Sequence, residues 1–87
     1  MRTGDHVKHG PTGETWVVGY VDGDRMSWLG WPPGEARTED CTVVKACTDE
    51  EHEQVLRQLA QSQDGKRARM GVLGLAALGK SPLGRGA

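Results

Sequence analysis

The chain has 87 residues, a formal net charge of −1 and 36% hydrophobic residues, with three tryptophans, one tyrosine and no phenylalanine. A chain this short has room for one domain with a thin core, because small domains bury only about 60% of the surface that the unfolded chain exposes. A nearly neutral charge gives no general attraction to nucleic acid or to an anionic membrane, which argues against functions based on such an attraction.

The first half of the chain predicts short β-strands separated by turn residues. A first strand covers Gly4–His9, and the Gly-Pro-Thr-Gly sequence after it predicts a tight turn, because proline fixes φ and glycine accepts a positive φ. Glu14–Val21 is rich in β-branched and aromatic residues, which favours a second, longer strand. Strict alternation along this strand places Trp16, Val18 and Tyr20 on one face of the sheet.

Three further segments complete the predicted sheet. The Asp-Gly pair after the second strand is a strong hairpin signal, so Arg25–Leu29 should be the antiparallel neighbour of that strand. The prolines in Trp31–Gly34 end the third strand, since proline donates no hydrogen bond to a sheet. Glu35–Asp40 is expected to be a loop or a weak edge strand, and Cys41–Cys47 is expected to be the last strand.

One helix is predicted behind the strands. Thr48 and Glu51 match a capping box, so a helix should begin at Asp49 and run to about Ser62. At about four turns it would be marginal alone, and we expect it to pack on the sheet. Its apolar stripe consists of Val55, Leu56, Leu59 and Ala60.

The C-terminal part differs from the rest of the chain in charge and composition. Residues 1–63 contain 6 Lys/Arg and 11 Asp/Glu, whereas residues 64–87 contain 5 and 1. Met70–Leu78 is apolar but interrupted by glycines, each of which costs about 1 kcal/mol in a helix relative to alanine. Three interpretations of this segment stay open: a helix that binds a partner, a helix docked on a second copy of the chain, or an unstructured apolar tail.

Together these elements predict a mainly β fold, a small antiparallel β-barrel followed by one C-terminal α-helix and a flexible tail. Residues 1–62 would form the barrel and the helix, and residues 63–87 would form a basic, Gly-rich tail that is either disordered or docked on a partner. No N-terminal apolar region typical of a signal peptide and no apolar run of about 18 residues is present, so a cytoplasmic location is the default expectation.

The residues that could bind a metal or act as nucleophiles do not form a motif. His6, His9, Cys41 and Cys47 are ligand types, but their spacings do not match structural zinc sites, so no metal or cofactor is expected. The two cysteines lie too far apart on one extended strand for a disulfide, and we expect free thiols. Cys41 follows an aspartate, and the sequence around it has no basic cluster that would lower the pKa of its thiol. We therefore expect no catalytic residue and no enzymatic activity.

Aromatic residues are the best candidates for a binding site. Trp16 and Trp28 are expected in the core, whereas Trp31, beside two prolines, is expected to be exposed and to anchor a protein partner. Acidic loops around Trp31 would suit a basic partner surface, including one that normally binds nucleic acid. The predicted partner-binding residues are Trp31, Tyr20, Asp22, Asp24, Glu35, Glu39 and Asp40.

A nucleic-acid-binding module is the alternative function. Lys66, Arg67 and Arg69 would contact phosphates, while the aromatic residues of the sheet would stack on bases. The acidic residues 1–63 would repel the phosphate backbone, so this alternative ranks below protein binding.

Five motifs follow one another along the strands: Gly4-Asp5-x-Val7-x-His9, Pro11-Thr12-Gly13-Glu14, Trp16-Val17-Val18, Gly23-Asp24 and Asp40-Cys41-Thr42-Val43-Val44. In this order they resemble the small SH3-like barrels of the KOW and Tudor type, and also short proteins that phages and prophages encode. The resemblance covers about residues 4–61. It implies an SH3-like barrel and, through the phage proteins, a small accessory protein that binds a host protein or complex stoichiometrically, such as an inhibitor of a defence complex.

Overall fold

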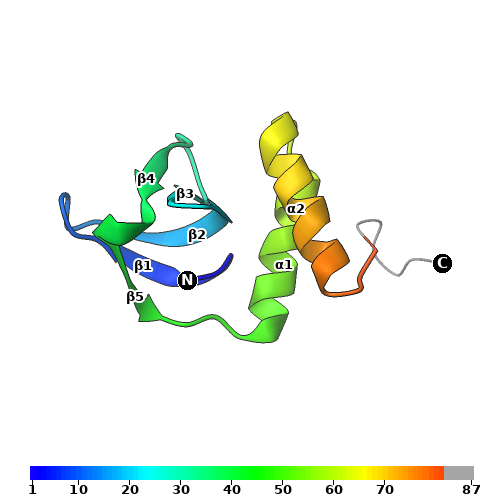
Figure 1. The fold of residues 1–87 in the computed structure, drawn as a ribbon, viewed down its shortest axis with the longest axis horizontal. Helices are drawn as coiled ribbons and strands as arrows, with labels where there is room; N and C mark the ends of the chain where they lie inside the picture. Colours follow the sequence, from blue (N-terminus) through cyan, green and yellow to red (C-terminus); the bar gives the residue numbers. More distant parts are fainter. Residues whose placement is uncertain (82–87) are drawn as a thin grey trace.

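An antiparallel sheet and two helices make up the fold in the computed structural model, which describes residues 1–81 (Figure 1). The helices α1 (Asp49–Ala60) and α2 (Gly65–Ala77) lie side by side next to the sheet. The 3₁₀ helix η1 (Thr38–Asp40) connects the last two strands. The sheet has the strand order β4-β3-β2-β1-β5, where the strands are β1 (His6–His9), β2 (Thr15–Asp22), β3 (Arg25–Trp28), β4 (Glu35–Arg37) and β5 (Cys41–Lys45).

Most of the predicted elements are confirmed at their predicted places. The Asp-Gly turn joins β2 to β3 as antiparallel neighbours, and Gly23 has the positive φ of 64° that this turn requires. The capping box is present, because Thr48 accepts a hydrogen bond from the backbone of Glu51 and the Glu51 carboxylate accepts one from the backbone of Thr48. The weak edge segment after the prolines forms β4 and η1.

The predicted fold class is wrong in two respects. The sheet is not closed into a barrel, because its two edge strands, β4 and β5, do not pair with each other. β4 is only three residues long, and after it the 3₁₀ helix η1 leads the chain to the other edge, where β5 pairs with β1. Within residues 1–81 there are also two α-helices rather than one helix and a flexible tail, since residues 65–77 form α2. The part of the expected tail at residues 82–87 lies outside the described residues.

The glycines of α2 allow it to pack closely on α1. A Cβ atom on Gly71 would lie 2.6 Å from the backbone oxygen of Leu56 and within 3 Å of backbone atoms of Ala60. A Cβ atom on Gly74 would overlap the side chain of Leu56. Sequence reasoning counted these glycines only as a cost to helix formation, whereas here they permit a close approach of two helices that buries Leu56, Leu59 and Leu75.

A β-bulge in β2 changes which side chains share a face of the sheet. The register between β2 and β3 shifts between Val18 and Tyr20, so that Val18 pairs with Trp28 and Tyr20 pairs with Ser27. The extra residue is Gly19, where a Cβ atom would lie 2.9 Å from the backbone oxygen of Ser27. The prediction that Tyr20 shares a face with Trp16 and Val18 is therefore wrong, and Tyr20 points to the side of the sheet on which α2 lies.

The sheet has its own small core on the other face. Val7, Val18, Met26 and Ala36 form its buried centre, and Trp16 and Trp28 pack against them while remaining partly exposed. The expectation that these two tryptophans belong to the core is thus confirmed in part, because both pack against the core but are only partly buried. A core this thin cannot cover large side chains completely, so Trp16 and Trp28 remain partly accessible to solvent.

The N-terminal segment ties the sheet to the start of α1. The buried Asp5 carboxylate accepts hydrogen bonds from the backbone nitrogen of Arg2 at 3.0 Å and from that of Cys47 at 2.9 Å. The Arg2 guanidinium in turn donates to the backbone oxygen of Cys47 and to Asp49 in the first turn of α1. These contacts fix the connection between β5 and α1 against the rest of the sheet.

Candidate functional site

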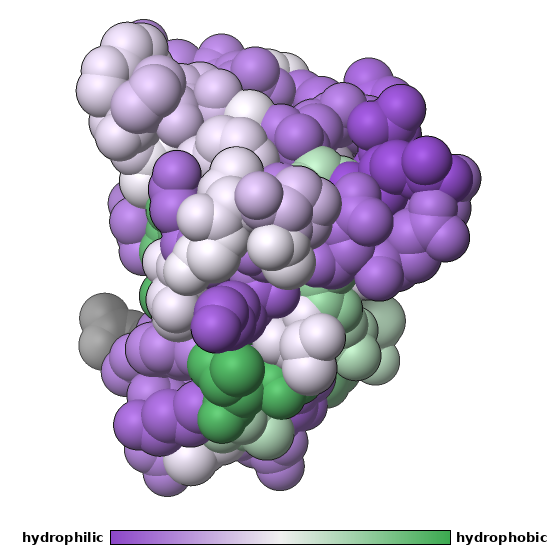
Figure 2. All heavy atoms as spheres, turned by 90° about the vertical axis from the view of Figure 1, so that its left-hand side faces the viewer, coloured by the Kyte–Doolittle hydropathy of each residue, from purple (hydrophilic) through white to green (hydrophobic). Residues whose placement is uncertain are grey.

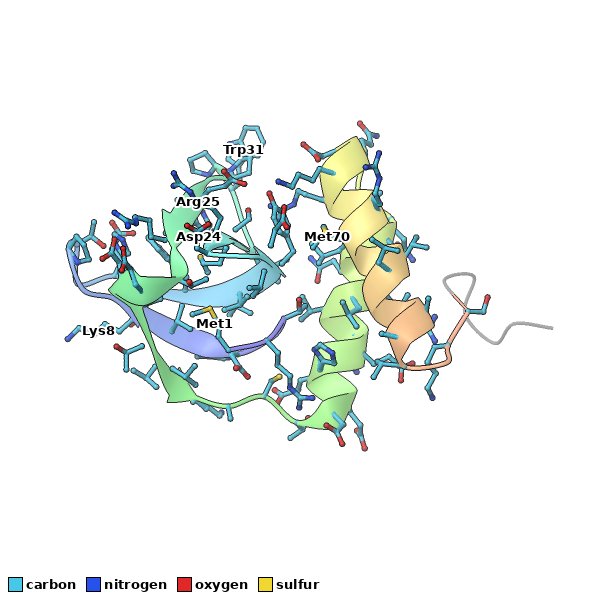
Figure 3. The ribbon with its side chains drawn as sticks, viewed as in Figure 1. Met1, Lys8, Asp24, Arg25, Trp31 and Met70 are labelled. Carbon is cyan, nitrogen blue, oxygen red and sulfur yellow. The ribbon has the colours of Figure 1, made fainter. Side chains whose placement is uncertain are left out.

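The Trp31 loop, residues 29–34, presents the most exposed large apolar side chain on the sheet. Trp31 is 90% exposed and points away from the sheet and the helices (Figure 3). Trp28 of β3 contacts this loop, and its Nε1 donates a hydrogen bond to the backbone oxygen of Pro32 at 3.0 Å. The Trp28 ring also lies directly against Gly34, where a Cβ atom would overlap the ring. Trp31 is therefore an exposed aromatic group on a loop with limited freedom.

A row of stacked rings continues from this loop across the sheet. The ring centroids of Trp28 and Trp16 are 4.2 Å apart, and those of Trp16 and His9 are 4.6 Å apart. Trp16 Nε1 donates to the Glu14 carboxylate at 3.1 Å, which fixes the orientation of its ring. The stack supports Trp28 and, through it, the Trp31 loop.

The end of the molecule opposite the helices is mostly hydrophilic. Figure 2 shows strongly hydrophilic surface with pale, weakly polar areas between, and a green hydrophobic patch in the lower half. The green patch lies where β5 runs, and β5 exposes Val43 and Val44. Trp31 is a larger side chain than either valine and is more exposed than both, so it is the larger apolar group that this end of the molecule offers to a partner.

Tyr20 lies between the sheet and α2 rather than on a free surface. It is 5% exposed, and its hydroxyl donates a hydrogen bond to the Glu35 carboxylate at 2.9 Å. Burial raises the pKa of Tyr20, and the hydrogen bond to Glu35 raises it further. Tyr20 is therefore a neutral hydrogen-bond donor at this junction, and its ring faces Lys66 and Arg67 of α2.

Lys66 in the first turn of α2 binds the acidic side chains beside Tyr20. Its Nζ lies 3.2 Å from Asp22, 3.7 Å from Glu35 and 5.3 Å from the centre of the Tyr20 ring. The hydrogen bond to Asp22 raises the pKa of Lys66. Lys66, which was predicted to contact phosphate, thus lies against Asp22 and Glu35, which were predicted to bind a protein partner.

Arg67 is held by the protein as well. Its guanidinium donates to the Oγ of the buried Ser27 at 2.6 Å and to the backbone oxygen of Trp28 at 3.1 Å, and it lies 5.8 Å from the Tyr20 ring centre. Arg69, the third predicted phosphate-binding residue, is exposed on α2. We call the set of Tyr20, Asp22 and Glu35 on the sheet with Lys66 and Arg67 on α2 the Tyr20 site.

The other predicted acidic residues lie apart from the Tyr20 site. Asp24 is exposed in the hairpin between β2 and β3 (Figure 3). Glu39 in η1 forms an ion pair with Arg37. Asp40 is half-buried, and its backbone oxygen accepts a hydrogen bond from Gly10. The acidic surface expected around Trp31 is thus divided, and most of its charges face a cation of the same chain.

A hollow lies between the Tyr20 site and the Trp31 loop, and residues of both line it. Its volume is about 200 Å³, and residues of the Trp31 loop form one wall while the start of α2 forms another. Sequence reasoning missed Ser27 and the position of Lys66 in this site. The signal that could have found them is Gly19, since a glycine inside a strand indicates a bulge. The lining residues are Tyr20, Ser27, Pro33, Gly34, Glu35, Asp64, Lys66 and Arg67.

The thiols and histidines are not arranged for metal binding in the described part of the chain. Both cysteines are free, and burial raises the pKa of each thiol, with the charge of Asp40 adding to the rise at Cys41 and Asp5 adding to the rise at Cys47. Cys47 donates to the backbone oxygen of Thr3. Among residues 1–81, no group of three or more His, Cys, Asp or Glu side chains could hold a metal ion.

Comparisons with known proteins do not assign the site. Neither family models, nor curated proteins, nor solved structures gave a match to this chain. Within residues 1–81, neither helix has the length and the apolar character needed to cross a membrane.

Proposed function

We propose that this protein is a small non-enzymatic binding protein that acts by stoichiometric interaction with a protein partner through Trp31. The 90% exposure of Trp31 is the observation that carries the proposal. Exposing a tryptophan in this way is unfavourable in the free protein, and tryptophan is the residue type most enriched at the energetic centres of protein interfaces.

The support below Trp31 favours binding with a small loss of freedom. After Trp31, Trp28 holds Pro32 through a hydrogen bond and packs on Gly34. Before Trp31, the backbone nitrogen of Leu29 donates to the backbone oxygen of Val17 at 2.7 Å, so both ends of the loop segment are fixed. A loop that is already ordered loses less entropy when a partner binds. Trp31 would therefore insert into an apolar pocket of the partner as a preformed anchor.

The alternative of nucleic-acid binding has less support. Lys66 pairs with Asp22 and Glu35, and Arg67 donates to Ser27 and Trp28. Two of the three cations assigned to phosphate contacts are thus already engaged with the sheet. The expectation of a phage protein that binds a host target stays a prediction from the resemblance.

The test is affinity capture of the tagged protein from a lysate of the source cells with and without nuclease. We expect Trp31→Ala to weaken partner binding by about 2 kcal/mol, the threshold of an interface hot spot, and so by more than tenfold. The Trp31→Ala variant should keep the unfolding midpoint of the wild type, because a 90% exposed side chain contributes little to the core.

Leu73→Ala is the matched control, since Leu73 is a large apolar side chain that is 57% exposed on α2. It should retain the partner. A partner that Trp31→Ala and Leu73→Ala capture equally well would contradict the proposed site. Recovery of nucleic acid alone, or of proteins that nuclease removes, would contradict the proposed function.

A further inference from the structure

The chemistry of the Tyr20 site is that of a binding site for a lysine side chain. Two carboxylates, those of Asp22 and Glu35, lie within 4 Å of one ammonium group, and the Tyr20 ring lies 5.3 Å from it. A compact ammonium charge suits this arrangement of two point acceptors and an aromatic ring. In the free protein Lys66 of the same chain supplies this group.

We infer that the Tyr20 site receives a lysine-bearing basic segment of the protein partner, and that Lys66 occupies this site until the partner binds. This inference rests on the proposed function in so far as the partner is a protein. It adds the chemistry of the partner and a competition between the partner and α2 for the same carboxylates.

The contacts of Lys66 can be exchanged at small cost. The side chains of Lys66, Asp22 and Glu35 are 51%, 55% and 44% exposed. Ion pairs between side chains that remain this hydrated add little net free energy, because water solvates each partner almost as well. A lysine from outside would replace one such pair by another of the same kind.

Arg67 and the helix packing can keep α2 in place when Lys66 leaves. The two hydrogen bonds from Arg67 to Ser27 and Trp28 do not involve the carboxylates that bind Lys66. Further along, Gly71 lies against the backbone of α1. Release of Lys66 therefore requires only a rotation of one exposed side chain and no undocking of α2.

The hollow gives a basic segment room beside its lysine. It is about 200 Å³ in volume and lies between the Tyr20 site and the Trp31 loop, with Pro33 and Gly34 on the loop side and Asp64 on the helix side. Because residues 33 and 34 belong to the same loop as Trp31, one partner surface can bind Trp31 and place a lysine near Glu35. Asp64 supplies a further carboxylate for a second cation.

The test is a titration of the full-length protein with octalysine, followed by amide chemical shifts in NMR and by calorimetry. Lys66→Ala should bind octalysine about two- to fivefold more tightly than the wild type, because removal of a weakly held internal ligand raises the fraction of open sites. The shifts should be centred on Tyr20, Asp22, Ser27 and Glu35. In the Lys66→Ala background, Glu35→Gln should abolish the gain.

Arg69→Ala is the matched control, since it removes the same charge from an exposed position on α2. It should change the affinity much less than Lys66→Ala does. Equal effects of the two variants, or shifts centred on the acidic first turn of α1, would overturn the inference, because either result indicates general attraction of octalysine to negative charge. The assay involves neither the natural partner nor Trp31, so a failed Trp31→Ala test and a failed octalysine test remain distinguishable.

Discussion

Gly71→Ala should destabilise the protein by about 2 kcal/mol and lower its melting temperature by roughly 10 °C. The added methyl group would lie 2.6 Å from the backbone oxygen of Leu56 and 2.9 Å from the Cα of Ala60. Backbone atoms cannot rotate away as a flexible side chain can, so α1 and α2 must separate. Overpacking of this kind costs about 3 kcal/mol, and the better helix propensity of alanine returns only about 1 kcal/mol.

Two other glycines of α2 serve as graded controls in the same thermal or urea unfolding measurement. Gly65 begins the helix, and a Cβ atom added there would meet no atom within 4 Å, so Gly65→Ala should be neutral or slightly stabilising. Gly74 faces only the side chain of Leu56, which can move, so Gly74→Ala should cost less than Gly71→Ala. If Gly71→Ala is as stable as Gly65→Ala, the close packing of α1 on α2 is incorrect.

The strands and α1 could be predicted because each has a local signal. The Asp-Gly turn, the capping box at Thr48 and the prolines after Trp31 act on the backbone of their own neighbours, and all three are found at the expected places. By contrast, the formation of α2 depends on its contact with α1. Its glycines disfavour an isolated helix, and only contact with α1 makes their missing side chains an advantage.

Most residues of the Tyr20 site could be predicted from the sequence, but Ser27 and the arrangement of the site could not. Tyr20, Asp22 and Glu35 were assigned to one function and Lys66 and Arg67 to another, whereas the structure places them in contact. The reason is the bulge at Gly19, which turns Tyr20 toward α2. A shift of one residue reverses the face of every following side chain, and no pattern in β2 alone shows where α2 will dock.

Asp5→Asn should destabilise the protein by about 3 kcal/mol at neutral pH, because hydrogen bonds to a buried charged group are each worth about 1.5 to 3 kcal/mol. The carboxylate accepts from two backbone N–H groups, those of Arg2 and Cys47. An asparagine has one oxygen, so its amide group would face one of these N–H donors without a hydrogen bond. Urea unfolding at neutral pH measures this loss, and Asp24→Asn, at an exposed turn position, is the control expected to stay near the wild type.

The pH dependence of the difference separates the role of the charge from a loss of packing. Burial by itself raises the pKa of Asp5, but the hydrogen bonds from the backbone of Cys47 and Arg2 outweigh burial and hold the pKa below its usual value. A carboxyl group whose pKa is lower in the folded state stabilises the fold above its unfolded pKa and loses this contribution as the pH falls through its folded pKa. The gap between wild type and Asp5→Asn should therefore be largest near neutral pH and shrink as the pH falls below about 4. A gap of constant size down to acid pH would contradict this account, since it would mean that the carboxylate charge contributes nothing to the junction between the sheet and α1.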